Sequence, residues 1–440
     1  MFAAALLTVG TQFLEYHGWF AGPEGRILDF LLGRGSRKTA SASPIFVVEI
    51  DDAAYASPCF NSTSPLDPSV VGSLVKEVAV LHPTVIGVDI LTDAPRYSSR
   101  YQSMAAEFRS PRSRIIWISG AEKSHFEVAP FYWWLFGSHN HLIVKPTAVL
   151  GYEPGELIDH PEIVWGLPVF PPDDDAGFRR FPRKIEASAD PQTSVFRESR
   201  CGWARIVAEE YCKGTGNCQQ HKQAADEIFL SYDKDPPTEF KLSQLASCAA
   251  PGTLVSGGAR WQEFTKTAPG KMVLIGGTFG SSRDFYATPN GRVPGLLINA
   301  YAAQAEIDGH FIQETHRPVA VVFDFLIGCF IGLVVFSHQV FKDLREKTFL
   351  KRWAGHVAKN ELRYMILGSL ILLVAVAGFM LGVFGRGYVL SFTAMAVGVV
   401  IHQLVEIWLM RPRDAPSPKH SPRSHPPKPR LARSPKRDRS

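Results

Sequence analysis

Cysteine, charged residues and nucleotide-binding motifs are all scarce in this sequence. Six cysteines in 440 residues are too few to build a disulfide-rich mini-protein, and the length allows about two to four domains. Neither GxGxxG nor GxxxxGK occurs, and the glycine-rich residues 276–280 fit neither pattern, which argues against nucleotide binding. No nucleophile stands beside a recognisable base, so hydrolase chemistry has little support.

Charge makes up only 20% of the residues, and the hydrophobic ones are concentrated in a few runs. Windows of about 19 residues identify spans at 319–336, 364–384 and 389–410. A weaker run at 1–20 reads as an uncleaved anchor, with a signal peptide as the alternative. The sequence therefore predicts an integral membrane protein with α-helical transmembrane segments.

Basic residues are distributed unevenly along the chain. Residues 337–363 carry a net charge of +4 and residues 411–440 carry +8; since the whole chain carries +5, the remainder carries −7. The positive-inside rule places both basic segments in the cytoplasm, and residues 21–318 then lie outside it, beyond the plasma membrane.

The tail 411–440 is expected to be disordered and holds no catalytic module. Its attraction to anionic lipid is the default interpretation, followed by docking of a cytoplasmic partner. Nucleic-acid binding is disfavoured because the tail lacks aromatic residues.

Four cysteines cluster in the predicted outside region, where an oxidising compartment permits disulfides. They are disulfide candidates, and sequence alone allows three pairings: Cys201, Cys212, Cys218 and Cys248. Cys212 and Cys218 flank a short flexible turn, which makes them the favoured pair. Cys59 is left over, and Cys329 lies in a predicted span. Zinc is a weaker alternative, because there is no CxxC and His221 is the one imidazole nearby.

The outside region has the pattern of an α/β fold. Short apolar runs bounded by turn residues predict strands at 45–50, 85–90, 114–119 and 271–277, and helical spacing predicts helices near 68–81, 98–108, 204–212 and 294–307. This alternation predicts a mainly parallel sheet with helices on both faces. Residues 121–198 read as an irregular insertion with at most an edge strand, and 213–260 as a second excursion. The last strand is expected to rejoin the first sheet, giving one domain.

Polar side chains follow several predicted strands. In a parallel sheet, ligands bind beyond the carboxyl ends of the strands, so these side chains are expected to converge there. The candidate ligand-binding residues are Asp51, Asp52, Asp89, Asp93, Thr278, Ser281, Ser282 and Asp284. The alternative is structural, since aspartates after strands often cap helices or loops. No catalytic residue and no metal site is assigned.

The predicted spans contain a few polar residues that are costly in a bilayer. Asp324 lies inside the first C-terminal span, and His402 and Glu406 share a face of the last, where they are possible partners of Asp324. Small-xxx-small spacings in the spans allow close helix packing, within one chain or across a homodimer.

Six motifs, in order, are similar to those of one family. They are residues 46–52, VIGVDI at 85–90, DDAGFR at 174–179, KMVLIGG at 271–277, DFYATP at 284–289 and VPGLLINA at 293–300. Together they resemble the type 2 CHASE domain, a sensory extracellular domain associated with cyclases and histidine kinases, over about residues 24–318. The resemblance implies a bacterial extracytoplasmic sensor followed by three membrane helices. Such sensors are normally tethered to a cytoplasmic kinase or cyclase, which the residues after 336 do not provide. No ligand, cofactor or catalytic residue carries over.

The sequence therefore predicts a membrane-bound, non-enzymatic sensor of an unknown stimulus. It would act in trans through a cytoplasmic signalling partner. Two alternatives stay open: a metal-dependent extracytoplasmic enzyme using Asp51, Asp52, Asp89 and Asp284, and a small membrane scaffold or transporter built around Asp324 and His402.

Overall fold

The fold is taken from a computed structural model. It describes residues 2–19, 21–34, 43–108, 113–135, 141–168, 171, 173, 175–188, 198–216, 218, 226–230, 232, 237–250, 253–309, 311–323, 325–326, 329, 374, 378–379 and 381–389. Among these residues, no helix combines the length and the apolar character needed to span a bilayer. Most of the predicted spans, the tail, and Asp324, His402 and Glu406 lie outside the described residues.

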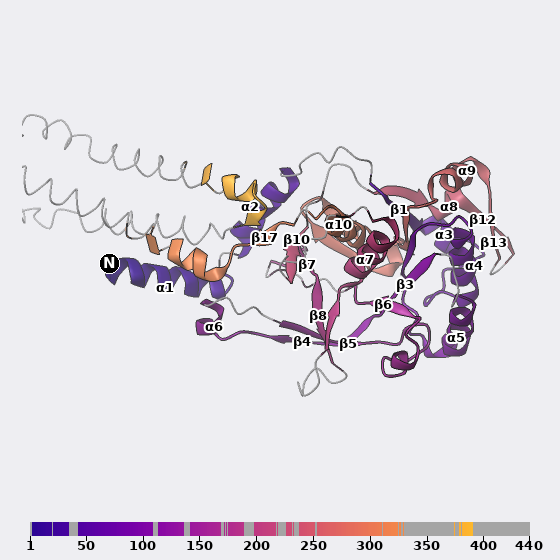
Figure 1. Cartoon of the computed structure of the whole chain (residues 1–440), viewed down its shortest axis with the longest axis horizontal. Coiled ribbons are helices and arrows are strands. Elements are labelled where there is room, and N and C mark those ends of the chain that lie inside the picture. The colour runs from indigo at the N-terminus through magenta and orange to yellow at the C-terminus, as the bar shows by residue number, and fades with distance from the viewer. Residues whose placement is uncertain are drawn as a thin grey trace, which may run out of the picture. The chain divides into compact units, whose positions relative to one another are not determined.

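A six-stranded parallel sheet forms the centre of the domain (Figure 1). Its order is β11-β1-β14-β2-β3-β6, with β1 Ile45–Ile50, β2 Val85–Asp89, β3 Arg114–Ile118, β6 Val164–Gly166, β11 Thr238–Lys241 and β14 Met272–Gly277. All five pairings are parallel. The predicted strand at 271–277 does rejoin the first sheet, and it lies between β1 and β2.

Helices cover both faces of this sheet, as predicted. Alternate residues of β1 point to opposite sides, so Phe46 and Val48 enter one hydrophobic core while Ile45 and Val47 enter the other. The first core is covered by α4 Pro68–Ala79, α5 Ser98–Glu107, α8 Leu242–Leu245 and α9 Gly258–Thr267. The second is covered by α7 Trp203–Thr215 and α10 Gly295–Asp308.

Local signals explain where the key helices begin and end. The Asp67 side chain accepts a hydrogen bond from the Ser69 amide at 2.9 Å, and Pro68 occupies the first turn of α4. α10 ends at Gly309, whose φ of 63° is the left-handed conformation that glycine adopts easily.

The region 121–198 is more ordered than the sequence predicts. It contains a second, four-stranded sheet in the order β4-β5-β8-β9, made of β4 Ala121–Glu127, β5 His141–Pro146, β8 Lys184–Ala187 and β9 Glu198–Cys201. It also supplies β6 to the central sheet. These strands lack a continuous apolar run: β4 reads AEKSHFE, which hides it from hydropathy.

The region 213–260 is also more regular than predicted, since it supplies β11, α8 and α9.

Two-stranded pairs complete the architecture: β7 Arg180–Pro182 with β10 Glu227–Phe229, β12 Ala246–Ala250 with β13 Thr253–Ser256, β15 Phe285–Thr288 with β16 Gly291–Pro294, and β17 Gln313–Glu314 with β18 Tyr388–Val389. The remaining helices are α1 Phe2–Tyr16, α2 Ala21–Arg34, α3 Asp52–Ala56 and α6 Phe131–Leu135, with single 3-10 turns at Pro95–Tyr97, Glu156–Asp159 and Gly280–Ser282.

The disulfides confirm the favoured pair and correct the choice of the other bonded cysteines. Cys212 and Cys218 are bonded, as favoured from their spacing. Cys59 is bonded to Cys248, 189 residues away, and Cys201 is a free thiol. Setting Cys59 aside was therefore wrong. The physical reason is tertiary: α3, which precedes Cys59, packs against α8, which precedes Cys248, so the two cysteines meet in space.

Candidate functional site

The carboxyl ends of three adjacent strands place two acidic residues in one row. Glu49 of β1 is in register with Gly276 of β14, and Gly276 is in register with Asp89 of β2. Side chains in register on parallel strands point to the same face, here the face covered by α10. A Cβ on Gly276 would lie 3.0 Å from Leu296 of α10 and 3.1 Å from the Cβ of Asp89, so a glycine suits the tight packing there.

Asp89, the last residue of β2, forms the first part of the site, together with Asn299 and Asp284. The amide nitrogen of Asn299, on α10, donates a hydrogen bond to Asp89 Oδ2 at 2.9 Å. Burial raises the pKa of Asp89 to about 7, the negative charge of Asp284 adds to the rise, and the Asn299 hydrogen bond opposes it.

Asp284 lies against the start of α10. A Cβ on Gly295 would collide with both carboxylate oxygens of Asp284, so the glycine leaves room for the acid. Burial raises the pKa of Asp284, and a hydrogen bond from the Tyr286 hydroxyl works in the opposite direction. Asp89 and Asp284, two of the residues expected to converge at this edge, therefore lie close enough for the charge of one to act on the other.

Glu49 was not among the sequence candidates. Its side chain is buried, and the hydroxyl of Thr278 donates to Glu49 Oε2 at 3.3 Å. Burial raises the pKa of Glu49 to about 7, and the charge and hydrogen bond of Glu239 add to this, while Thr278 and Lys241 lower it. The signal that could have found it is one acid inside the apolar strand IFVVEI.

The other candidates occupy structural positions at the same edge. Asp51 accepts hydrogen bonds from the Ser243 amide at 3.1 Å and hydroxyl at 2.7 Å, which ties β1 to α8. Asp52 accepts a hydrogen bond from the Gly280 amide at 2.9 Å.

The last three candidates are more scattered. Ser282 Oγ accepts a hydrogen bond from the Asp284 amide at 3.3 Å, and Ser281 is exposed in the same turn. Asp93, which follows β2, lies beside Gly120, which follows β3. Within the described ranges, no group of three or more histidine, cysteine, aspartate or glutamate side chains has metal-binding geometry.

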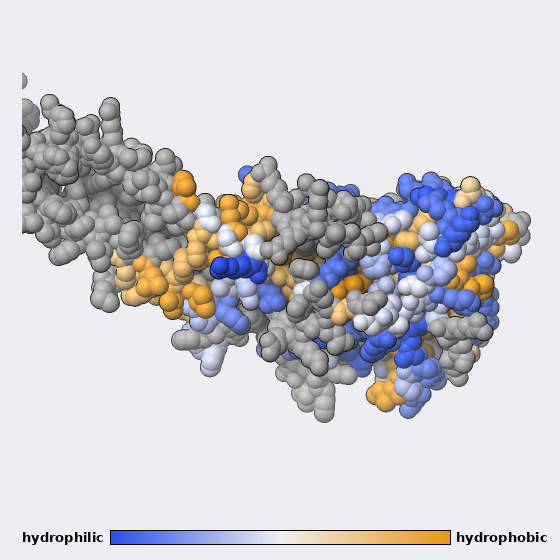
Figure 2. Space-filling view, turned by 45° about the horizontal axis from the view of Figure 1, so that its top comes forward, coloured by the Kyte–Doolittle hydropathy of each residue, from blue (hydrophilic) through white to orange (hydrophobic). Residues whose placement is uncertain are grey.

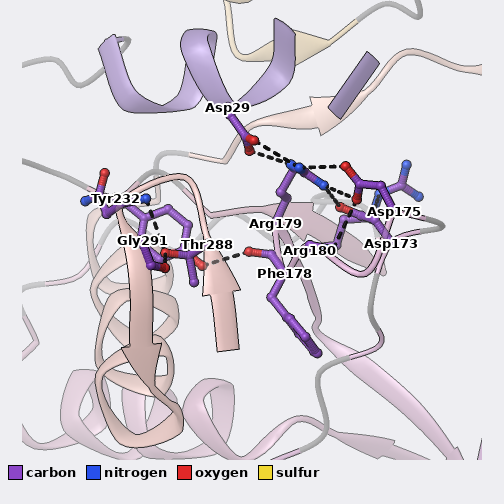
Figure 3. A network of polar contacts seen from close by, with 11 residues as sticks. Asp29, Asp173, Asp175, Phe178, Arg179, Arg180, Tyr232, Thr288 and Gly291 are labelled. Atoms are coloured by element: carbon purple, nitrogen blue, oxygen red, sulfur yellow. Dashed lines mark hydrogen bonds and ion pairs between the residues drawn. The ribbon is translucent and has the colours of Figure 1, made fainter. Parts of the chain in front are cut away.

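A second polar cluster joins the domain to the segments that flank it (Figure 3). Arg179 pairs with Asp29 of α2 at 2.6 Å, with Asp175 at 2.6 Å and with Asp173 at 3.1 Å. The Arg179 side chain is 6% exposed, whereas that of Asp29 is 34% exposed, so the arginine is removed from water and its partner on α2 is only partly so. The sequence singled out this arginine as part of a motif but gave no sign of its partner on α2.

The cluster continues through Arg180 and Arg317. Arg180 pairs with Asp173 at 3.1 Å, and with Glu227 and Glu314 at 3.6 Å. Arg317 pairs with Glu314 at 3.0 Å and with Glu15 of α1. We call the continuous set Asp29, Arg179, Asp175, Asp173, Arg180, Glu227, Glu314, Arg317 and Glu15 the ion-pair chain.

Comparison with known proteins identifies the family of this chain. A model of the CHASE2 domain matches residues 3–337. No curated protein and no solved structure matches the chain. CHASE2 domains are extracytoplasmic sensors and are not themselves catalytic, and the two disulfides fit such a location. The chain belongs to the CHASE2 family of sensory domains.

Proposed function

We propose that this protein is a multi-pass sensor of the bacterial plasma membrane. Its large α/β domain responds to an extracytoplasmic stimulus, the ion-pair chain passes the change to the membrane helices, and a separate cytoplasmic protein receives it. The protein needs no catalytic activity of its own for this role. The observation that carries the proposal is the ion-pair chain, which joins the domain to both of its flanking segments.

The ion-pair chain begins on α2 and ends on α1, with the body of the domain between them. Glu314 and Arg317 immediately precede the predicted span 319–336, and residues 317–323 are helical. The Arg317–Glu15 pair is buried, and breaking one partner of a buried pair typically costs about 3–5 kcal/mol. The pairs of Asp29 and Arg180 are about one-third exposed, so water screens them and each contributes less. Together these pairs are expected to make the domain and its flanking segments move together. A displacement of the domain would therefore reach the first C-terminal span.

Contacts near residues 311–318 also support the predicted topology. β17 pairs with β18, and the Gln313 amide donates to the Gly387 carbonyl at 2.8 Å. With 337–363 and 411–440 in the cytoplasm, the turn at 385–388 between the spans 364–384 and 389–410 is expected outside it, as is the end of the domain at 318. A small hydrophobic cluster of Leu28, Leu32, Phe229, Ile312, Phe384 and Val389 surrounds this pairing.

Exposed hydrophobic side chains gather on the same segments, which supports their position at a bilayer. They include Val9, Phe13, Trp19, Phe30, Val319, Val322 and Leu326, each more than 45% exposed. Figure 2 shows the corresponding hydrophobic surface over the N-terminal helices, while the far end of the domain is mostly hydrophilic. A contiguous apolar surface of this kind is typical of a membrane or protein contact.

Coupling across the membrane can be tested without knowing the stimulus. We would introduce Ser337→Cys at the predicted cytoplasmic end of the span and follow its rate of maleimide labelling in membranes. Arg180→Ala, which interrupts the ion-pair chain, is expected to change that rate. Arg205→Ala removes a half-exposed pair with Glu209 inside α7 and is the matched control. An unchanged rate in Arg180→Ala, with the domain still folded, would count against signalling.

The partner is tested separately. The basic segments 337–363 and 411–440 are its proposed docking sites, because they combine positive charge with a predicted cytoplasmic location. A cytoplasmic protein should be cross-linked to the full chain in membranes and lost when residues 411–440 are removed or the charges of 337–363 are reversed. Failure to recover any such partner would contradict action in trans.

A further inference from the structure

Buried acids in this domain are usually paired with arginine. Glu306 pairs with Arg183 at 2.6 Å, and both side chains are less than 8% exposed. Glu15 pairs with Arg317, and Asp173 with Arg179 and Arg180. This is the expected arrangement, because an acid removed from water needs a compensating charge.

Asp89 and Asp284, which are partly buried, depart from that pattern. Within the residues that the structure describes, neither forms an ion pair with lysine, arginine or histidine, and the charge that acts most strongly on Asp89 is the negative charge of Asp284. The partial positive charge at the start of α10 offsets only part of the cost of placing two acids together. This arrangement favours a positively charged ligand between them.

Asn299 supplies a second, independent observation. Its side chain is 1% exposed and its amide nitrogen faces Asp89 at 2.9 Å, while its amide oxygen Oδ1 is buried and has no hydrogen-bond partner. A buried acceptor left without a partner costs about 1–3 kcal/mol. Rotation of the amide about its last side-chain bond would exchange its nitrogen and oxygen, so that the oxygen would face Asp89.

The chemistry of the three side chains selects the ligand. Carboxylate and amide oxygens are the ligands of hard cations, and the glycine at 295 leaves the Asp284 carboxylate room beside the start of α10. We propose that Asp89, Asp284 and the amide oxygen of Asn299 bind one divalent cation of the Mg²⁺ or Ca²⁺ class. This inference rests on the proposed sensory function and names the chemical class of its stimulus.

The site is connected to the ion-pair chain by α10. Asn299 lies in the first half of this helix, and Glu306 in its last turns is held by Arg183. Four residues after the helix cap at Gly309, the chain enters β17, which contains Glu314. A cation that pulls Asn299 toward the carboxylates therefore acts on the helix that leads to Glu314. It can shift the sensor only if it binds the two states of the domain with different affinity.

The test uses the full chain in detergent micelles, stripped of metal by a chelator and then titrated with Mg²⁺ or Ca²⁺ alone. Calorimetry should show one site, and the thermal unfolding midpoint should rise as that site fills. Asp284→Asn should unfold at a higher temperature than the wild type without metal, because it removes an uncompensated charge. It should also bind the ion at least tenfold more weakly. Asn299→Asp, which adds a carboxylate, should bind more tightly.

Glu49→Gln is the matched control. It removes a buried acid from the same row without touching the proposed ligands, so the ion should bind to it as to the wild type. The site would be overturned if neither ion binds, or if the ion binds equally to the wild type and to Asp284→Asn. Ion binding without a change in Ser337→Cys labelling would support the site and count against the proposed sensory function. A labelling rate that Arg180→Ala changes, in a protein that binds neither ion, would count against the site and support the sensory function.

Discussion

Buried carboxylates in this domain are stabilised in different ways, and the difference can be measured residue by residue. Arg179 and Arg183 neutralise acids through short, buried ion pairs. Glu49 instead faces Glu239, Lys241 and Thr278, a mixed environment in which burial is the largest influence on its pKa. Glu49 should therefore make the stability of the protein depend on pH.

We expect Glu49 to destabilise the fold as the pH rises. Its pKa is about 7 in the folded state and 4.5 ordinarily, so the folded state holds a proton that the unfolded chain releases. The stability contributed by the protonated form is complete below about pH 4.5 and is lost as the pH rises through 7. The loss is on the order of 1.4 kcal/mol per pKa unit.

Glu49→Gln should flatten this dependence. The measurement is the thermal unfolding midpoint of the full chain at a series of pH values, with chelator present so that metal binding does not contribute. Glu77→Gln, which changes an exposed glutamate on α4, is the control and should keep the slope of the wild type. The same slope in Glu49→Gln would show that the residue is ionised throughout.

At the level of elements, the two disulfides should contribute unequally to stability. Cys59–Cys248 joins residues 189 apart, and Cys212–Cys218 joins residues 6 apart. In the loop-closure account, the longer bridge restricts the unfolded chain more, by roughly 3 kcal/mol. Replacing Cys59 and Cys248 by alanine should lower the unfolding midpoint more than replacing Cys212 and Cys218. An equal or larger effect of the short bridge would contradict this.

The sequence predicted the elements that are apolar on both faces. β1 and β14 were found within a residue of their ends, because a buried parallel strand is a continuous run of hydrophobic residues. β11 was missed because its four residues include Glu239 and Lys241, both exposed at the edge of the sheet. The second sheet was missed for a similar reason, since polar residues interrupt its strands.

The candidate site was predictable only in part. Asp89 and Asp284 could be named because each follows a recognisable strand, and parallel strands end at a common edge. Asn299 could not, and the single acid in the apolar strand 45–50 marks Glu49 without showing its partners, because what matters about both residues is a contact made across the fold. Asn299 lies 210 residues from the acid it contacts, and Thr278 lies 229 residues from Glu49. Short-range sequence patterns carry no information about such distances.

At the scale of the whole molecule, the predicted topology makes a direct claim about sidedness. Ile158→Cys, at a position that is 78% exposed in the domain, should react with a membrane-impermeant maleimide on intact cells. Ser424→Cys, in the basic tail, should react only after the membrane is permeabilised. Labelling of both positions from the same side would contradict the proposed arrangement and the sensory function with it.

The place of β14 in the central sheet also has a consequence for biogenesis. This strand lies between β1 and β2, yet 182 residues separate the end of β2 at Asp89 from its first residue, Met272. β1 and β2 cannot join into one sheet until that late segment has been translocated. Contacts so distant in sequence form slowly, and unpaired strand edges aggregate readily. During export, the nascent domain should therefore depend on chaperones that shield these edges until the missing strand arrives.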